Sequence, residues 1–206
     1  MRYVVPDLPP DHRHESELEV EKSRFIAWIC HAPNTAAFEV MLAEARRLHP
    51  HASHHCTAWI AGPPGEQTAI GFSDDGEPGG TAGRPMFQVL DGAALGQVGS
   101  VVTRYFGGTK LGTGGLARAY SRAVAQALET LPRREVVERS PLRLKVDFAG
   151  EAEARAWLAE RDVPVEQADY GAEGVALTVG WPNDAPVELS ALSTRLRGRL
   201  ALLQDD

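Results

Sequence analysis

The chain has 206 residues, of which 43% are hydrophobic, and its formal net charge is −7 at pH 7. This hydrophobic content supports packed cores and excludes a wholly disordered chain, while the length suits two domains of about 100 residues each. The acidic balance argues against a protein that attracts nucleic acid over its whole surface. With only two cysteines, Cys30 and Cys56, the sequence predicts reduced thiols rather than a disulfide scaffold.

The first residues, MRYVVPDLPPDHRHESE, lack the basic and apolar regions of a signal peptide, and the chain contains no apolar run of membrane-spanning length. We therefore expect a soluble cytoplasmic protein that is not exported and has no membrane partner. Residues 1–19 are rich in Pro, His and Glu. This composition predicts a loosely held arm.

The pattern of apolar residues predicts elements of both types in the first two thirds of the chain. In chain order they are a strand over 23–30, a helix over 35–49, strands over 55–61 and 67–72, a short helix over 85–90, a strand over 99–105 and a helix over 115–131. Pro50 ends the first helix, and Gly62-Pro63-Pro64-Gly65 joins the second and third strands by a turn. Leu116, Ala119, Ala123, Ala127 and Leu131 are predicted to face the core.

The segment Pro132 to Glu135 is interpreted as a linker, which divides the chain into domains 1–132 and 133–206. Beyond it the predicted order is strand (142–148), helix (151–161), strand (165–170), strand (174–181), helix (187–197) and strand (199–204). This βαββαβ order is typical of a ferredoxin-like sandwich, so the fold class is α+β.

Two glycine-rich loops are the most informative segments. The first, SDDGEPGGTAGRP from Ser73 to Pro85, contains the carboxylates Asp74, Asp75 and Glu77; the second, RYFGGTKLGTGGLAR, runs from Arg104 to Arg118. So many glycines indicate unusual backbone conformations or close approaches. We expect the two loops to form one site with an acidic and a basic half, in which the cations lower the pKa of the nearby acids.

The second loop is a candidate for binding phosphate. Residues 101–139 hold seven Lys or Arg against three acids, and the loop precedes a helix, whose free N–H groups attract anions. The order of Lys and Gly matches neither a Walker A loop nor a dinucleotide-binding G-x-G-x-x-G. Tyr105 and Phe106 are candidates for stacking on nucleic-acid bases. The predicted anion or nucleic-acid contacts are Arg104, Lys110, Gly112, Gly114, Gly115, Arg118 and Arg122.

Metal binding and catalysis have weaker support in the sequence. The segment HPHASHHC, from His49 to Cys56, is rich in imidazoles, but no second ligand pair follows it, so packed and solvated histidines are favoured over zinc. Asp74, Asp75 and Glu77 suit either a magnesium ion or a structural turn. No nucleophile motif is present. The sequence thus predicts no cofactor and no metal.

Four segments together resemble the IMPACT family. They are SRFIA (23–27), ASHHCTAW (52–59), SDDGEPGGTAGRP (73–85) and VVTRYFGGTKLGTGGLARAY (101–120). The resemblance implies an N-terminal domain similar to domain IV of elongation factor G, of the ribosomal-protein type, and a C-terminal domain similar to its domain V. Eukaryotic members act in the amino-acid starvation response, a stress response, through an additional RWD domain. This chain has no room for that domain, so we expect no RWD-mediated partner.

The leading hypothesis is a protein that binds RNA or the ribosome and regulates translation, with the basic loop holding phosphates. A third possibility is a protein-interaction module without nucleic-acid or catalytic chemistry. The main alternative is an enzyme that acts on a phosphorylated or anionic small molecule. In that case Asp74, Asp75 or Glu77 would act as metal ligand or general base, and His54 would carry a proton. The sequence identifies neither the ligand nor a reaction.

Overall fold

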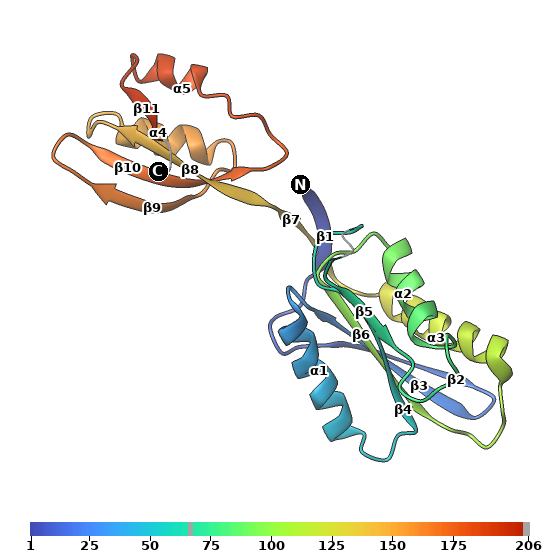
Figure 1. The fold of residues 1–206 in the computed structure, drawn as a ribbon. Helices are drawn as coiled ribbons and strands as arrows, with labels where there is room; N and C mark the ends of the chain where they lie inside the picture. The colour runs from blue at the N-terminus through green and yellow to red at the C-terminus, as the bar shows by residue number, and fades with distance from the viewer. Residues whose placement is uncertain (66–67, 204–206) are drawn as a thin grey trace. The chain divides into compact units, whose positions relative to one another are not determined.

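The structure is a computed structural model that describes residues 1–65 and 68–203. The chain divides into two compact units (Figure 1). We call residues Tyr3–Val136 the N-terminal unit; the C-terminal unit begins at Val137 and includes Met1 and Arg2. None of the helices in the described part of the chain is long and apolar enough to span a membrane.

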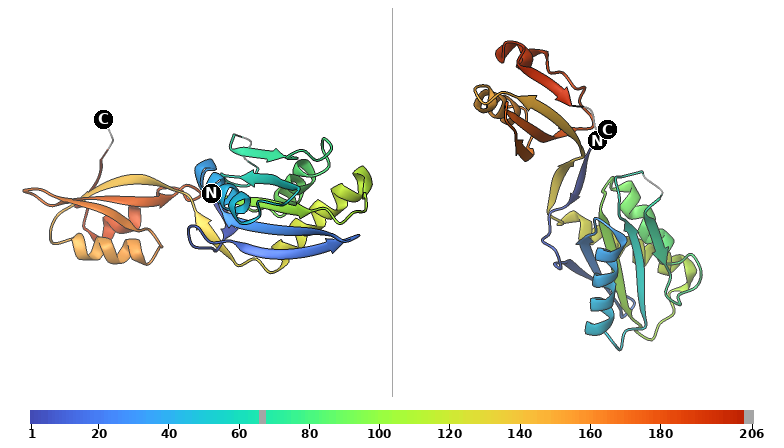
Figure 2. Two further views of the ribbon diagram at one scale, coloured as in Figure 1. Left: turned by 90° about the horizontal axis from the view of Figure 1, so that it is seen from below. Right: turned by 60° about the vertical axis from the view of Figure 1, so that its left-hand side comes forward.

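A five-stranded antiparallel sheet in the order β2-β3-β6-β4-β5 is the centre of the N-terminal unit. The elements from β1 to β7 are β1 (Arg2–Pro6), β2 (His14–Val20), β3 (Ser23–His31), α1 (Thr35–Leu48), β4 (His54–Ile60), β5 (Ile70–Ser73), α2 (Gly83–Gly92), β6 (Val98–Tyr105), α3 (Gly112–Glu129) and β7 (Arg133–Val137). Helix α1 covers one face of the sheet, and α2 and α3 cover the other (Figures 1 and 2).

Strand β3 explains this three-layer arrangement, because its residues are apolar on both faces. Phe25, Ala27 and Ile29 pack in the core under α2 and α3. The alternate residues Ile26, Trp28 and Cys30 pack in a second core under α1. The sheet therefore separates two cores, and a side chain's parity along the strand decides which helices it meets.

The predicted loose arm over residues 1–19 is wrong, because much of it is strand. Tyr3 and Val5 of β1 are buried. Strand β2 pairs with β3 along its whole length, from His14 opposite Ile29 to Val20 opposite Ser23. Its polar sequence, HESELEV, suits an edge strand, because only Leu18 is fully buried and the charged side chains remain exposed.

The segment interpreted as a linker, residues 132–135, runs into a strand. Residues 133–137 form β7, which pairs with β1 in a two-stranded sheet. Pairing with β1, which is distant in the sequence, holds this segment in an extended conformation. The N-terminal unit ends at Val136, a few residues beyond the predicted boundary at 132.

The C-terminal unit contains the predicted order of elements. They are β8 (Arg139–Val146), α4 (Glu151–Ala159), β9 (Val165–Tyr170), β10 (Val175–Pro182), α5 (Ser190–Arg195) and β11 (Leu200–Leu203). The strands form an antiparallel sheet in the order β11-β8-β10-β9. Its core joins alternate residues of β8 and β10, such as Leu144 and Leu177, to Trp157 of α4 and Leu192 of α5.

Most of the predicted helices and strands begin and end within a few residues of the bounds that the sequence predicted. Helix α3 begins at Gly112 rather than 115, so that the glycines of the second loop form its first turn. The five residues predicted to face the core in this region, Leu116, Ala119, Ala123, Ala127 and Leu131, are all buried. Gln67 and Gln204, the predicted ends of two strands, lie outside the described residues.

Candidate functional site

The two glycine-rich loops do meet, through one buried ion pair. Glu77 of the acidic loop is 8% exposed and Arg104 of β6 is 5% exposed. The Arg104 Nη1 atom donates a hydrogen bond of 2.6 Å to Glu77 Oε1, and the hydroxyl of Tyr120 on α3 donates to the same oxygen at 2.8 Å. Arg104 Nη2 also contacts the Oγ of the buried Ser23, at 3.4 Å. The pair thus connects the acidic loop, β3, β6 and α3.

This geometry corrects the prediction that Arg104 holds a phosphate. Its side chain points into the core beneath α3, because Arg104 shares its face of β6 with Val102, which packs there. The guanidinium is buried, so an external anion cannot reach it, and the carboxylate of Glu77 already neutralises its charge. We therefore remove Arg104 from the proposed phosphate contacts.

The side chain of Asp74 caps the N-terminus of helix α2. Ala82, the residue before the helix, provides no side-chain cap. The carboxylate of Asp74 takes that place: its Oδ1 accepts from the backbone N–H of Ala82 at 2.9 Å and of Gly83 at 2.8 Å, and its Oδ2 accepts from Gly80 at 2.7 Å. Burial raises the pKa of Asp74, but these backbone bonds outweigh it and hold the pKa below its usual value. The cause is therefore backbone N–H groups and not the predicted cations.

We expect Asp74→Asn to lower the free energy of unfolding at pH 7 by about 1–3 kcal/mol, because the amide brings an N–H₂ group to donors that need an acceptor. A depressed pKa contributes stability above the unfolded pKa of about 4 and loses it as pH falls through the folded pKa. The difference between wild type and variant should therefore shrink below about pH 4. Urea denaturation at several pH values measures it.

Asp91→Asn is the matched control, since Asp91 is an exposed acid of the same helix. It should change stability at pH 7 by less than about 0.5 kcal/mol. Equal stabilities for wild type and Asp74→Asn across the pH range would contradict the capping role.

Asp75 and His54 hold the acidic loop against β4. The Asp75 carboxylate accepts from the backbone N–H of His55 at 2.6 Å and lies 3.3 Å from Nη2 of Arg46 on α1. The Nδ1 of His54 lies 2.8 Å from the backbone oxygen of Asp75 and is its donor, which leaves Nε2 facing Glu77 Oε2 at 3.8 Å. The carboxylates of Asp74, Asp75 and Glu77 thus each bind a different part of the protein. This supports the structural interpretation of the acidic loop.

The histidine-rich segment does not converge on one point either. His49 Nδ1 bonds to the hydroxyl of Tyr105 at 2.9 Å, and His55 Nδ1 bonds to Thr103 Oγ1 at 3.0 Å. Burial lowers the pKa of His55, although the nearby Asp75 partly opposes it. Within residues 1–65 and 68–203, no group of three or more His, Cys, Asp or Glu side chains is arranged to hold a metal ion.

Cys56 is a packed, unreactive thiol in this environment. It is fully buried, and its Sγ donates to the backbone oxygen of Asp74 at 3.0 Å. Burial raises the pKa of Cys56 to about 12, so the thiol is protonated at neutral pH. Burial, with the neighbouring Cys56 and Glu77, also raises the pKa of Tyr120, which keeps its hydroxyl a hydrogen-bond donor.

The other predicted cations lie together at a separate, open place that none of Asp74, Asp75 and Glu77 lines, so the prediction of one site with an acidic and a basic half is wrong. Lys110, Arg118 and Arg122 are exposed and line a cavity of about 520 Å³ at the start of α3, together with Gly115 and one acid, Glu21. The first turn of α3 carries no acidic residue, and the preceding Leu111 provides no side-chain cap. The unpaired N–H groups and positive end of the helix therefore add to the field of the three cations.

The predicted glycines and aromatic residues have distinct places. Gly112 begins α3 with a φ of +69°, and Gly114 and Gly115 follow in its first turn. Tyr105 lies away from the cavity of Lys110, and its hydroxyl is bonded to His49. Phe106 is 51% exposed, with the Arg104 guanidinium 5.6 Å from its ring centroid. Neither aromatic residue is among those lining the basic cavity.

Sequence reasoning missed Tyr120 and Ser23, which complete the surroundings of Arg104. Tyr120 lies four residues after the core residue Leu116, a spacing that puts both on one face of α3. This spacing was the sequence signal that could have predicted the inward position of Tyr120. Nothing in the sequence pairs Ser23 with a residue more than 80 positions away.

Comparison with known proteins gives consistent matches. Residues 21–128 match the family described as the Impact N-terminal domain. "IMPACT family member YigZ" of Escherichia coli (strain K12) is 41% identical over 186 residues, which cover 90% of this chain and 91% of that protein. An "IMPACT family member" of Haemophilus influenzae is 46% identical over 132 residues, 64% of each chain. A solved structure, "Crystal structure of an hypothetical protein", has a TM-score of 0.70 and 38% identity, covering 100% of this chain and 98% of its own.

Proposed function

Because the chain belongs to the IMPACT family, as the sequence motifs indicated, we propose that it binds RNA or the ribosome in the cytoplasm and regulates translation. The resemblance in the four motifs implies this role, and the exposed basic cavity of the N-terminal unit provides a surface suited to it. The proposed ligand is the sugar-phosphate backbone, because the cavity offers positive charge and helix N–H groups.

We further propose that both units have folds of translation-factor type, the N-terminal unit like domain IV of elongation factor G and the C-terminal unit like its ferredoxin-like domain V. The strand order β11-β8-β10-β9, with both helices joined to one core, supports the second likeness.

Three cations around one cavity are the observation that carries the proposal. Lys110 lies in the second glycine loop just before α3, and Arg118 and Arg122 lie on two successive turns of α3. Arg118 and Arg122 are four residues apart and therefore share one side of the helix. In an acidic chain, such an excess of exposed positive charge gives a phosphate-bearing partner one preferred place to bind.

We expect Lys110→Ala and Arg118→Ala each to weaken binding of RNA, single-stranded or structured, equally for all sequences. Each change should reduce the slope of log affinity against log salt by about one or less, because each removes one phosphate contact. The measurement is a salt titration of binding for wild type and both variants.

Arg84→Ala is the matched control, because Arg84 is an exposed arginine of α2 that does not line the cavity. It should leave the slope unchanged. Negligible affinity of the wild-type protein for RNA at low salt would overturn RNA binding. If Lys110→Ala left RNA affinity intact but abolished binding of a small phosphorylated molecule, the enzyme alternative would replace it.

A further inference from the structure

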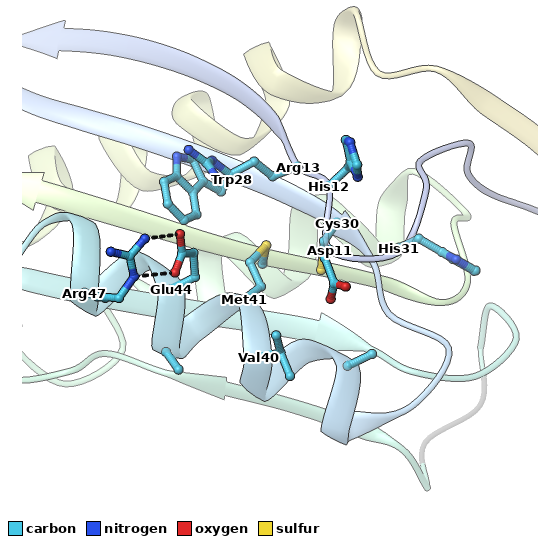
Figure 3. Close-up of a pocket in the computed structure, with 12 residues that line it drawn as sticks. Asp11, His12, Arg13, Trp28, Cys30, His31, Val40, Met41, Glu44 and Arg47 are labelled. Atoms are coloured by element: carbon cyan, nitrogen blue, oxygen red, sulfur yellow. Dashed lines mark hydrogen bonds and ion pairs between the residues drawn. The ribbon is translucent and has the colours of Figure 1, made fainter.

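A second cavity lies on the opposite face of the sheet, under α1 (Figure 3). Its volume is about 510 Å³, within the range of about 300–1,000 Å³ that is typical of small-molecule sites. Trp28 and Cys30 of β3 and Met41 of α1 contribute to its lining, with Ala37 and Val40 also from α1. The cavity is separate from the basic cavity, because α1 and α3 cover different faces of the sheet.

Three of the charged side chains that line this cavity, Arg13, Glu44 and Arg47, have ion-pair partners, whereas the exposed Asp11 has none among the described residues. The Arg47 guanidinium donates two hydrogen bonds of 2.7 Å to Glu44, and Arg13 forms an ion pair with Glu15 at 3.6 Å. Burial also raises the pKa of Cys30 to about 12, so its thiol is neutral. An anionic ligand would find no unpaired Arg side chain in this lining and would lose its hydration on entering a largely apolar cavity.

One polar group in the lining lacks a partner. Trp28 is 1% exposed, and its indole Nε1 has no hydrogen-bond acceptor among the described residues. The Arg13 guanidinium lies over the ring, 3.8 Å from its centroid, and the Arg13 side chain is 34% exposed. A buried donor without an acceptor costs about 1–3 kcal/mol, which a ligand acceptor would recover if Arg13 turned aside.

We propose that the cavity under α1 binds an uncharged, largely apolar small molecule that carries a hydrogen-bond acceptor for the Trp28 indole. The apolar floor supplies the affinity through burial of the ligand surface, and the unpaired N–H selects molecules with a carbonyl or similar group. This site is independent of RNA binding, since none of its lining residues borders the basic cavity.

Acetophenone and ethylbenzene are suitable probes, because they have nearly the same shape and only acetophenone carries an acceptor. We expect acetophenone to bind the full chain with a Kd of about 1 mM or below, and ethylbenzene about tenfold more weakly. Benzoate, which adds a charge to the same ring, should bind at least about tenfold more weakly than acetophenone. NMR titration of the α1 amide signals measures all three.

Two variants test the cavity and the indole donor independently of each other. Ala37→Phe should abolish binding by filling the cavity, whereas Ala36→Phe, at an exposed position of α1 outside the lining, should not. Trp28→Phe removes the donor and should bring the affinities of acetophenone and ethylbenzene together. Absence of saturable binding, or binding that survives Ala37→Phe, would overturn the site. A preference for acetophenone retained in Trp28→Phe would overturn the role of the indole.

Discussion

Glu77→Ala is expected to lower the free energy of unfolding of the N-terminal unit by about 3–5 kcal/mol, because it leaves the Arg104 charge buried without a partner. Glu77 also accepts the hydroxyl of Tyr120, so the variant loses the acceptor of a second buried donor. Urea denaturation of the full chain, followed by NMR signals of the five-stranded sheet, measures the loss.

The double variant Glu77→Leu with Arg104→Met shows whether the unpaired charge causes the loss. An apolar pair of similar volume avoids a buried charge, so it should recover about 2 kcal/mol relative to Glu77→Leu alone. Recovery should be incomplete, since Tyr120 still lacks its acceptor. A Glu77→Ala variant within about 0.5 kcal/mol of wild type would show that the ion pair does not hold the loop.

Gly107→Ala is expected to destabilise the N-terminal unit by about 3 kcal/mol or more, through a steric clash that no side-chain movement relieves. A Cβ atom at Gly107 would lie 2.0 Å from the backbone carbon of Lys22. The Gly107 N–H donates to the Oγ of the buried Ser23 at 3.1 Å, so the two segments cannot separate without losing this bond. The midpoint of urea denaturation gives the effect.

Gly79→Ala is the control for this substitution, because an added Cβ at Gly79 meets no atom within 4 Å. It should change stability by no more than about 0.5 kcal/mol. If Gly107→Ala and Gly79→Ala unfolded at the same urea concentration, the close contact between the second loop and the start of β3 would not constrain the fold.

The sequence predicted β3 and α3 well and missed the polar strands β2 and β7 for a physical reason; it also missed β1, although Tyr3 and Val5 of that strand are buried. Strand β3 and helix α3 carry their own apolar pattern, so their places could be read locally. Strand β2 has one fully buried residue, Leu18, and β7 has none. Both become strands through hydrogen bonds to partners elsewhere in the chain, and local pattern does not record such pairing.

Some features of the candidate site were also predictable from the sequence, and others were not. That the two glycine loops meet could be predicted from their complementary charges. That Arg104 faces inward follows from its parity with Val102 in β6, which the loop-based reasoning overlooked. The shared side of Arg118 and Arg122 was predictable from helix spacing, whereas Lys110 lies before α3. The cavity under α1 was not, because its lining joins three segments whose contact depends on the tertiary fold.

The order of strands in the sheet also governs when the N-terminal unit can form during synthesis. Strand β6, residues 98–105, lies between β3 and β4, although both precede it in the chain. Until β6 leaves the ribosome, β3 and β4 each have an unpaired inner edge, and such edges are open to pairing with other chains. The first hundred residues therefore cannot complete their sheet alone. A nascent chain interrupted before β6 therefore leaves the edges of two strands open to pairing with other chains.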